Sequence, residues 1–453
     1  MTRPQTYPAL ARALLGHAGP ILIAQLASMS TAIVDTLITA RVGTVDLAAV
    51  GIGAGLYMSV MLACAGVVQG LTPIAAHQVG AKDLTRLPAT FQQGLWLCAL
   101  LAVAGMAILF TPGWMLEAND VAPEVAGRTR AYLGVLALSL PGTLVYRACG
   151  GMLNALGRPR ALMFLGLANA GSHALLAPVL AFGWFGLPAL GAGGCALSVA
   201  FNTTLLAACG LVWLTRAPAS RPLRLLAHWH GPRWALLREH LRLGVPIGMS
   251  TFVEMSSFAL IGLLVAGLGA EAVGANRLLG NFAGACYMLP LSISVATLTL
   301  VGQAAGAGDR QRVRRVAATG LALGCGLASV VGVVLHLCAA PLVRGSVPEP
   351  AVQALALGLV PLIAFYQLFD AAQTLAAQAL RGLKITTGPM IGHILSFWGV
   401  GLGGGWWLCY HGWPEPLGLA GFWMAAVASS TLASLLFCTM LWLTLRPSAR
   451  SAT

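Results

Sequence analysis

The chain of 453 residues is 58% hydrophobic and only 9% charged, and its mean hydropathy is +0.82. These values exclude an ordinary soluble domain, in which about a quarter of the residues are charged. The formal net charge of +13 is high enough to suggest a nucleic-acid-binding protein. The basic residues are concentrated in short connections between apolar runs, however, and this pattern excludes nucleic acid as a partner.

Apolar runs of about 20 residues, the length that a membrane helix needs, recur along the whole chain. They predict an all-α polytopic membrane protein with twelve transmembrane helices. The first run is too long for a signal peptide, and no small-residue cleavage site follows it. The expected spans are 17–39, 47–70, 90–110, 131–151, 161–182, 191–214, 245–267, 281–302, 316–340, 354–379, 388–409 and 419–444.

An even number of spans puts both termini on one side of the membrane. The termini and the even-numbered connections carry most of the 26 basic residues, among them Arg381. The positive-inside rule therefore predicts that both termini are cytoplasmic. The basic clusters are expected to contact anionic lipid of the bilayer. Arg147 is the one basic residue expected inside or near a span.

The chain repeats itself at half its length. Six spans return the chain to the same side, so the two halves share one orientation. The repeat predicts two pseudosymmetric six-helix lobes, 1–215 and 244–453, joined by an Arg-rich cytoplasmic linker at 216–243. The repeated turns that end in Asp83 and Asp309 are expected to cap helices. At offsets of 225 to 227, the segments VGTVDLAAVGIG, HQVGAKD, NALGRP and PALGAGG match GLGAEAVGANRL, QAAGAGD, ALRGLK and PLGLAG.

Three carboxylates, Asp35, Glu254 and Asp370, interrupt long apolar runs, whereas the other acidic residues lie in or beside polar connections. A carboxylate at membrane depth costs roughly 2.5–3.5 kcal/mol, so we expect each to hold a proton, a metal cation or a cationic ligand. Glu254 and Asp370 are predicted to form a paired acid site that shares one proton or captures one cation. The alternative for this pair is a structural hydrogen bond between two helices.

Asp35 also has a structural alternative, in which its carboxylate bonds to the backbone or to neighbouring hydroxyls and fixes the helix. Thr31, Thr36 and Thr39 are near enough in sequence to supply those hydroxyls.

The ten cysteines are scattered through the spans without a C-x-x-C pair and are predicted to be small core residues.

Motifs of ATP hydrolysis and of hydrolytic enzymes do not occur in the sequence. It contains no G-x-x-x-x-G-K-[ST], no H-E-x-x-H and no G-x-S-x-G. We therefore expect a protein that is not an enzyme, has no cofactor, and is not driven by its own ATP hydrolysis.

The sequence resembles the multidrug and toxic compound extrusion (MATE) transporters, in particular their NorM-type branch. A proline fifteen residues before Asp35, which the family pattern includes, is present as Pro20 and is expected to kink its helix. The resemblance runs from about residue 15 to 445. Its motifs are PILIAQLASMSTAIVDTLITARVGTVDLAAVGIG, QGLTPIAAHQVGAKD, NFAGACYMLPLSISVATLTLVGQAAGAGD and FYQLFDAAQTLAAQALRGLK.

The resemblance implies a V-shaped bundle of two lobes that exports lipophilic organic cations, such as drugs and dyes, in exchange for H⁺ or Na⁺. A monomer is expected. The three membrane carboxylates fall at positions that resemble the ion and drug sites of the branch. Tyr366 matches its cation-site pattern, so Glu254, Asp370 and Tyr366 are the residues expected to bind Na⁺ if sodium is the coupling ion.

The fifth helix departs from the family pattern. Members often carry Asn and then a second Asn or Asp there, whereas His173 and Ala177 occupy these places and Asn169 lies one turn earlier. The loss of oxygen ligands disfavours sodium in the first half and favours protons. His173 either titrates during transport or bonds to a backbone carbonyl. Asn281 resembles a cavity-facing position of the eighth helix, although an amide bond between helices is equally consistent.

A flippase for a lipid-linked saccharide, from the same superfamily, is the alternative function. Such a carrier would need a cationic cavity for phosphates, whereas the charge expected inside this membrane region is mainly acidic. The sequence therefore favours a secondary active multidrug efflux antiporter.

Overall fold

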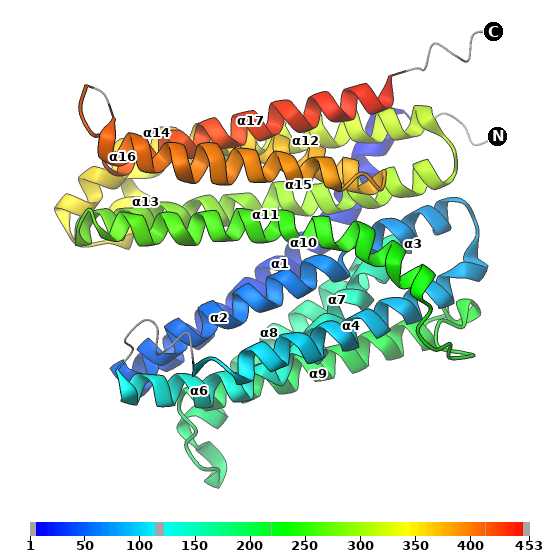
Figure 1. Cartoon of the computed structure of the whole chain (residues 1–453), viewed down its shortest axis with the longest axis horizontal. Coiled ribbons are helices and arrows are strands. Elements are labelled where there is room, and N and C mark those ends of the chain that lie inside the picture. The colour runs from blue at the N-terminus through cyan, green and yellow to red at the C-terminus, as the bar shows by residue number, and fades with distance from the viewer. Residues whose placement is uncertain (1–5, 114–121, 219, 413, 447–453) are drawn as a thin grey trace. The chain divides into compact units, whose positions relative to one another are not determined.

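The computed structural model describes residues 6–113, 122–218, 220–412 and 414–446, and within these ranges it contains helices and turns but no strand. Helices suit a chain in lipid because their backbone hydrogen bonds stay inside the segment. The α-helices, shown in Figure 1, are α1 (Tyr7–Val42), α2 (Thr44–Val68), α3 (Leu71–Gly80), α4 (Leu87–Phe110), α6 (Pro123–Ala137), α7 (Ser139–Ala155), α8 (Pro159–Phe182), α9 (Ala192–Arg216), α10 (Trp234–Ala266), α11 (Ala270–Gly306), α12 (Arg310–Leu337), α13 (Ala339–Ser346), α14 (Pro350–Gly382), α15 (Thr387–His393), α16 (Gly405–His411) and α17 (Leu419–Leu445). Short 3₁₀ turns are η1 (Leu84–Arg86), η2 (Trp184–Gly186) and η3 (Arg221–Leu223).

Eleven stretches of the described residues are long and apolar enough to cross a membrane. The twelfth predicted span, 388–409, is also helical, but the π-helix η4 (Ile394–Gly404) divides it into α15 and α16. Gly399, Gly401, Gly403 and Gly404 lie in this π-helix, and glycine gives the α-helix little support. The interruption therefore explains why this segment differs from the other eleven.

The chain forms two compact units, which we describe separately. The N-terminal unit is Gly19–Gly248, and the C-terminal unit consists of the described residues of Met249–Thr453 and Met1–Ala18. The divisions fall inside α1 and α10, one residue before Pro20 and two residues after Pro246. A proline removes a backbone donor from a helix interior, so both helices are weakened close to the division. The lobe limits and the kink at Pro20 that the sequence suggests stay predictions.

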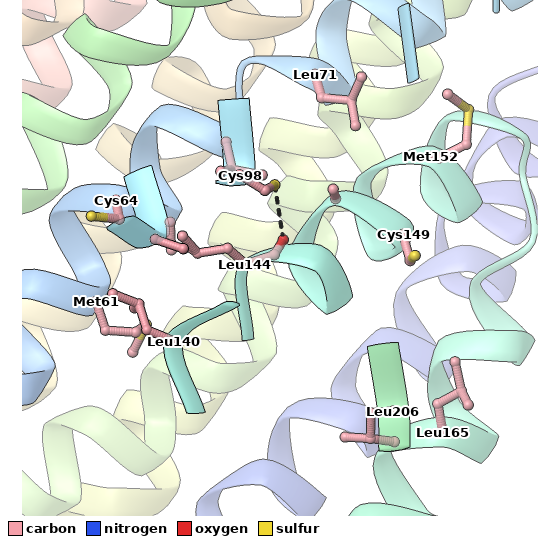
Figure 2. Packing of buried hydrophobic residues seen from close by; sticks show 14 of the residues in the cluster. Met61, Cys64, Leu71, Cys98, Leu140, Leu144, Cys149, Met152, Leu165 and Leu206 are labelled. Carbon is pink, nitrogen blue, oxygen red and sulfur yellow. Dashed lines mark hydrogen bonds between the residues drawn. The ribbon is translucent and has the colours of Figure 1, made fainter. Parts of the chain in front are cut away.

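Each unit contains its own apolar core. In the N-terminal unit, Leu140 and Leu144 are fully buried and lie near Cys98, whose thiol donates to the Leu144 carbonyl oxygen at 3.4 Å (Figure 2). Cys64 and Cys149 are also buried, as predicted for small core residues. The prediction is wrong for two other cysteines: Cys209 and Cys338 are exposed.

The internal repeat is visible in the backbone. Gly191, before α9, has φ 55° and ψ −133°, and Gly418, before α17, has φ 55° and ψ −136°. Few residues other than glycine adopt such a conformation, so the repeat conserves both the residue and the turn.

The helix caps of the two halves are less alike. Asp309 caps α12 by accepting from the Arg312 amide at 2.9 Å, as predicted, whereas Asp83 accepts from the Thr85 hydroxyl instead.

The segment predicted as a linker is bonded firmly to α4 within the N-terminal unit. The buried Gln92 amide donates to the Leu225 carbonyl oxygen at 3.0 Å and accepts from the His230 amide at 3.0 Å. Gln93 donates to the Gly231 carbonyl oxygen at 3.0 Å, and Trp96 donates to the His230 carbonyl oxygen at 3.1 Å. The segment before α10 is therefore a fixed part of this unit.

Candidate ion- and drug-binding sites

Asp35 of α1 lies against His173 of α8 in the N-terminal unit. The Asp35 Oδ1 atom is 3.0 Å from His173 Nε2, and the histidine is only 1% exposed. The Asp35 side chain keeps 21% of its surface exposed. Asp35 is thus a partly accessible carboxylate with a buried histidine as its partner.

The bond to Asp35 shows which nitrogen of His173 carries hydrogen. An ionised carboxylate only accepts, so Nε2, at 3.0 Å from Asp35 Oδ1, is the donor. In the neutral imidazole Nδ1 is then an acceptor, and it lies 3.0 Å from the Ser198 hydroxyl. Ser198 also accepts from the Asn202 amide at 3.3 Å, and Ser172 donates to Asn202 Oδ1 at 2.6 Å.

The threonine hydroxyls that the structural alternative for Asp35 offers as partners are bonded elsewhere. The hydroxyls of Thr31, Thr36 and Thr39 donate to the backbone carbonyl oxygens of their own helix. The alternative for His173 is wrong, because its bonds go to the side chains of Asp35 and Ser198.

The remaining residues that the sequence singled out in the fifth helix lie near this network. Asn169 contributes its backbone carbonyl, which accepts from the Ser172 hydroxyl at 3.1 Å. Ala177 is fully buried and offers no oxygen ligand. Ser198 and Asn202 are functional candidates that were not predicted, although two polar residues spaced i, i+4 in the apolar run of α9 are a usable signal.

Glu254 and Asp370 line a single cavity of about 420 Å³ in the C-terminal unit. Tyr366 and Asn281 also line it, so the residues that the sequence assigned to the second half come together in space. The remaining lining residues are mostly apolar or aromatic: Met255, Phe258, Ile261, Asn276, Arg277, Gly280, Ala283, Gly284, Tyr287, Phe422, Trp423 and Ala426.

Asp370 is the more enclosed of the two carboxylates. It is 3% exposed, and its Oδ1 atom accepts a hydrogen bond from Gln373 Nε2 at 3.1 Å. Tyr366, one turn earlier on α14, interacts with it through the hydroxyl, and the Tyr366 ring meets Trp423 edge-on at 6.3 Å. The Asp370 bond lies within one helix, so it is not the interhelical bond that the structural alternative requires.

The basic residues near this cavity differ from the sequence-based expectation. Arg381, expected in a cytoplasmic connection, is only 8% exposed at the end of α14 and interacts electrostatically with Glu254. Arg277 lines the cavity. Arg147, the expected candidate, is exposed on α7. A short polar run at a helix end does not show whether its arginine faces solvent or folds inward, which is why Arg381 was misplaced.

Chemically, the cavity combines two acids and the Arg277 guanidinium with aromatic and thioether surface. Carboxylate, phenol and amide oxygens are suitable ligands for a small hard cation such as Na⁺. The aromatic faces and Met255 can contact a lipophilic cation of varied shape.

Comparison with known proteins agrees with the internal repeat. The MatE family model matches residues 20–179 and again 246–407. A relative from Aromatoleum aromaticum, named "Probable multidrug resistance protein NorM", is 47% identical over 98% of this chain and 97% of its own length. "Multidrug resistance protein PmpM" of Pseudomonas aeruginosa is 32% identical over 94% of this chain and 90% of its own.

Solved structures share the fold. "Crystal structure of MATE in complex with MaL6" superposes with a TM-score of 0.88 at 16% identity, over 96% of both chains. The Vibrio cholerae MATE transporter VcmN in the bent form gives 0.85 at 17% identity, over 97% of this chain and 98% of its own. The twofold family match and the near full-length relatives show that this chain is a multi-pass membrane protein of the MATE family, related to its NorM-type members.

Proposed function

We propose that this protein is a secondary active multidrug antiporter that exports lipophilic organic cations in exchange for H⁺ or Na⁺. The names of its relatives, multidrug resistance proteins, support drug efflux. The observation that carries the proposal is the cavity in which Glu254 and Asp370 lie among aromatic rings. Such a cavity attracts a lipophilic cation through the charge of the two carboxylates and through cation–π contact with the aromatic rings.

The proposed cation site consists of Glu254, Asp370 and Tyr366, with Asn281 as a further oxygen donor. Two carboxylates in one cavity repel each other, so a cation or a proton between them relieves the repulsion. A drug cation and the coupling ion therefore compete for the same acids. By linkage, each must weaken binding of the other by the same factor.

The proposed proton site of the N-terminal unit is the Asp35–His173 pair. The His173 N–H hydrogen directed at Asp35 leaves little room for a metal cation on that side of the carboxylate. If His173 takes a second proton on Nδ1, Ser198 can turn its hydroxyl and accept instead of donating. The network can therefore accommodate both charge states of the imidazole. At its other end the Ser172 hydroxyl contacts the Asn169 carbonyl oxygen.

The proposed setting is the inner (plasma) membrane of a bacterium, with both termini cytoplasmic. The charge distribution of the sequence supports this orientation, since Arg-rich segments adjoin the connections assigned to the cytoplasm. The partners are the bilayer and cationic drugs or dyes, and the transporting unit is a monomer that needs no cofactor.

The test is efflux of ethidium from proteoliposomes under an imposed pH gradient and, separately, an imposed sodium gradient. Asp35→Asn, Glu254→Gln and Asp370→Asn should each abolish gradient-driven efflux while the protein remains folded. Glu349→Gln, at an exposed acid in the C-terminal unit, is the matched control. Wild-type efflux by all three variants would refute the proposal. Tight binding of anionic lipid-linked saccharides without binding of ethidium would instead support the flippase.

A further inference from the structure

His393 is a buried histidine that the proposed transport mechanism does not use. It is the last residue of α15, immediately before the π-helix, and is 2% exposed. Its ring packs edge-on against Phe437, with centroids 4.8 Å apart, and against Phe397 at 5.6 Å. Within the described residues its Nδ1 atom has no hydrogen-bond partner, so Nε2 is its one polar connection.

That connection leads to the Asp370 carboxylate. His393 Nε2 lies 3.1 Å from Gln373 Oε1, and the Gln373 Nε2 atom lies 3.1 Å from Asp370 Oδ1. An amide oxygen only accepts, so His393 donates and the amide NH₂ group faces the carboxylate. The reverse amide orientation would set two oxygens against each other and move the imidazole hydrogen to Nδ1, where it would have no acceptor.

The same amide also directs a second branch. Gln373 Nε2 donates to Thr374 Oγ1 at 3.0 Å, and Thr374 donates to the Tyr287 hydroxyl oxygen at 3.4 Å. The Tyr287 oxygen is thus an acceptor from Thr374, and Tyr287 lines the same cavity as Asp370. One imidazole N–H bond therefore sets the direction of two hydrogen-bond branches, one that ends on Asp370 and one that ends on Tyr287.

We propose that His393 is a positioning residue for the carboxylate cavity: through the Gln373 amide it fixes the direction of the hydrogen bonds that end on Asp370 and Tyr287. This inference rests on the proposed function of Asp370. The charged and titratable groups at this site are Glu254 of α10, Arg277 and Tyr287 of α11, and Tyr366 and Arg381 of α14.

The experiment titrates ethidium binding to the purified full-length protein against pH. Gln373→Leu removes the donor to the Asp370 anion, so protons should displace the dye about tenfold more readily, which is a midpoint about one pH unit higher. His393→Phe keeps an aromatic ring between Phe397 and Phe437 but lacks the N–H donor. It should move the midpoint in the same direction, by about half a unit or more.

The double variant tests whether the two residues act as one chain. If they do, His393→Phe/Gln373→Leu should shift the midpoint no further than Gln373→Leu alone. His336→Phe, at an exposed histidine of α12, is the matched control and should leave the midpoint unchanged. The inference is wrong if His393→Phe leaves the midpoint unchanged, or if the two shifts add in the double variant. In either case His393 would have only a packing role.

Asp370→Asn separates this inference from the proposed function. If this variant still releases ethidium with the wild-type pH dependence, Asp370 is not the competing group, and both the proposed role and the inference fail. If it abolishes the dependence while His393→Phe behaves as wild type, only the inference fails.

Discussion

His173→Gln separates hydrogen bonding from proton binding at Asp35. A glutamine amide can donate to the Asp35 carboxylate and accept from the Ser198 hydroxyl, which are the two bonds that His173 makes, each at 3.0 Å. The amide cannot take up a proton near neutral pH. If the Asp35–His173 pair holds the coupling proton, the variant should fold normally and lose efflux driven by a pH gradient.

The size of the structural effect follows from the two bonds. Removing them with His173→Ala costs about 1.5–3 kcal/mol for the bond to the carboxylate and about 0.5–1.5 kcal/mol for the bond to the hydroxyl. His173→Ala should therefore lower stability by about 2–4.5 kcal/mol, whereas His173→Gln should change it by less than about 1 kcal/mol. A thermal unfolding scan of the purified variants measures this difference.

Efflux of ethidium from proteoliposomes gives the functional readout. Ser59→Ala removes an exposed hydroxyl from α2 of the same unit and serves as the control for substitution in a membrane helix. The reasoning would be refuted if His173→Gln drove efflux at the wild-type rate under a pH gradient. That result would make His173 an orienting group and leave the proton to Asp35 alone.

Two further predictions concern orientation and the segment before α10. The first uses cysteine labelling in a background without native cysteines. A cysteine introduced at the exposed His228 should be labelled from the cytoplasmic side, and a cysteine at the exposed Glu349 from the outside. The opposite labelling would overturn the charge-based topology. Gln92→Leu should cost about 2–4 kcal/mol, because it leaves the Leu225 carbonyl and the His230 amide without their partner. It should also speed trypsin cleavage after Arg224, and unchanged cleavage would show that Gln92 does not hold the segment.

Much of the architecture could be predicted because it depends on local sequence. Apolar length predicts the helices, and repeated landmarks predict the two halves; Gly191 and Gly418 mark the same turn in each. The membrane carboxylates were also predictable, since burying a charge is costly wherever the helix lies.

Contacts made by tertiary packing could not be predicted in this way. The fifth-helix departure drew attention to His173, but its bond to Asp35 depends on how α1 and α8 pack. The inward position of Arg381 and the contact between His393 and Gln373 depend likewise on packing within the C-terminal unit. The π-helix has no periodicity that distinguishes it from an α-helix in an apolar run.

The two proposed sites place histidine and carboxylate at different separations, and this difference bears on coupling. In the N-terminal unit His173 bonds to Asp35 directly, so one proton can be shared within the pair. In the C-terminal unit the Gln373 amide stands between His393 and Asp370, and an amide passes on hydrogen-bond direction without accepting a proton near neutral pH. We therefore expect the Asp35–His173 pair to take up a proton between its two members, whereas at Glu254 and Asp370 the proton competes directly with the cation. Pseudosymmetric halves thus present unlike sites, a histidine–carboxylate pair in one and a pair of acids in a cavity in the other.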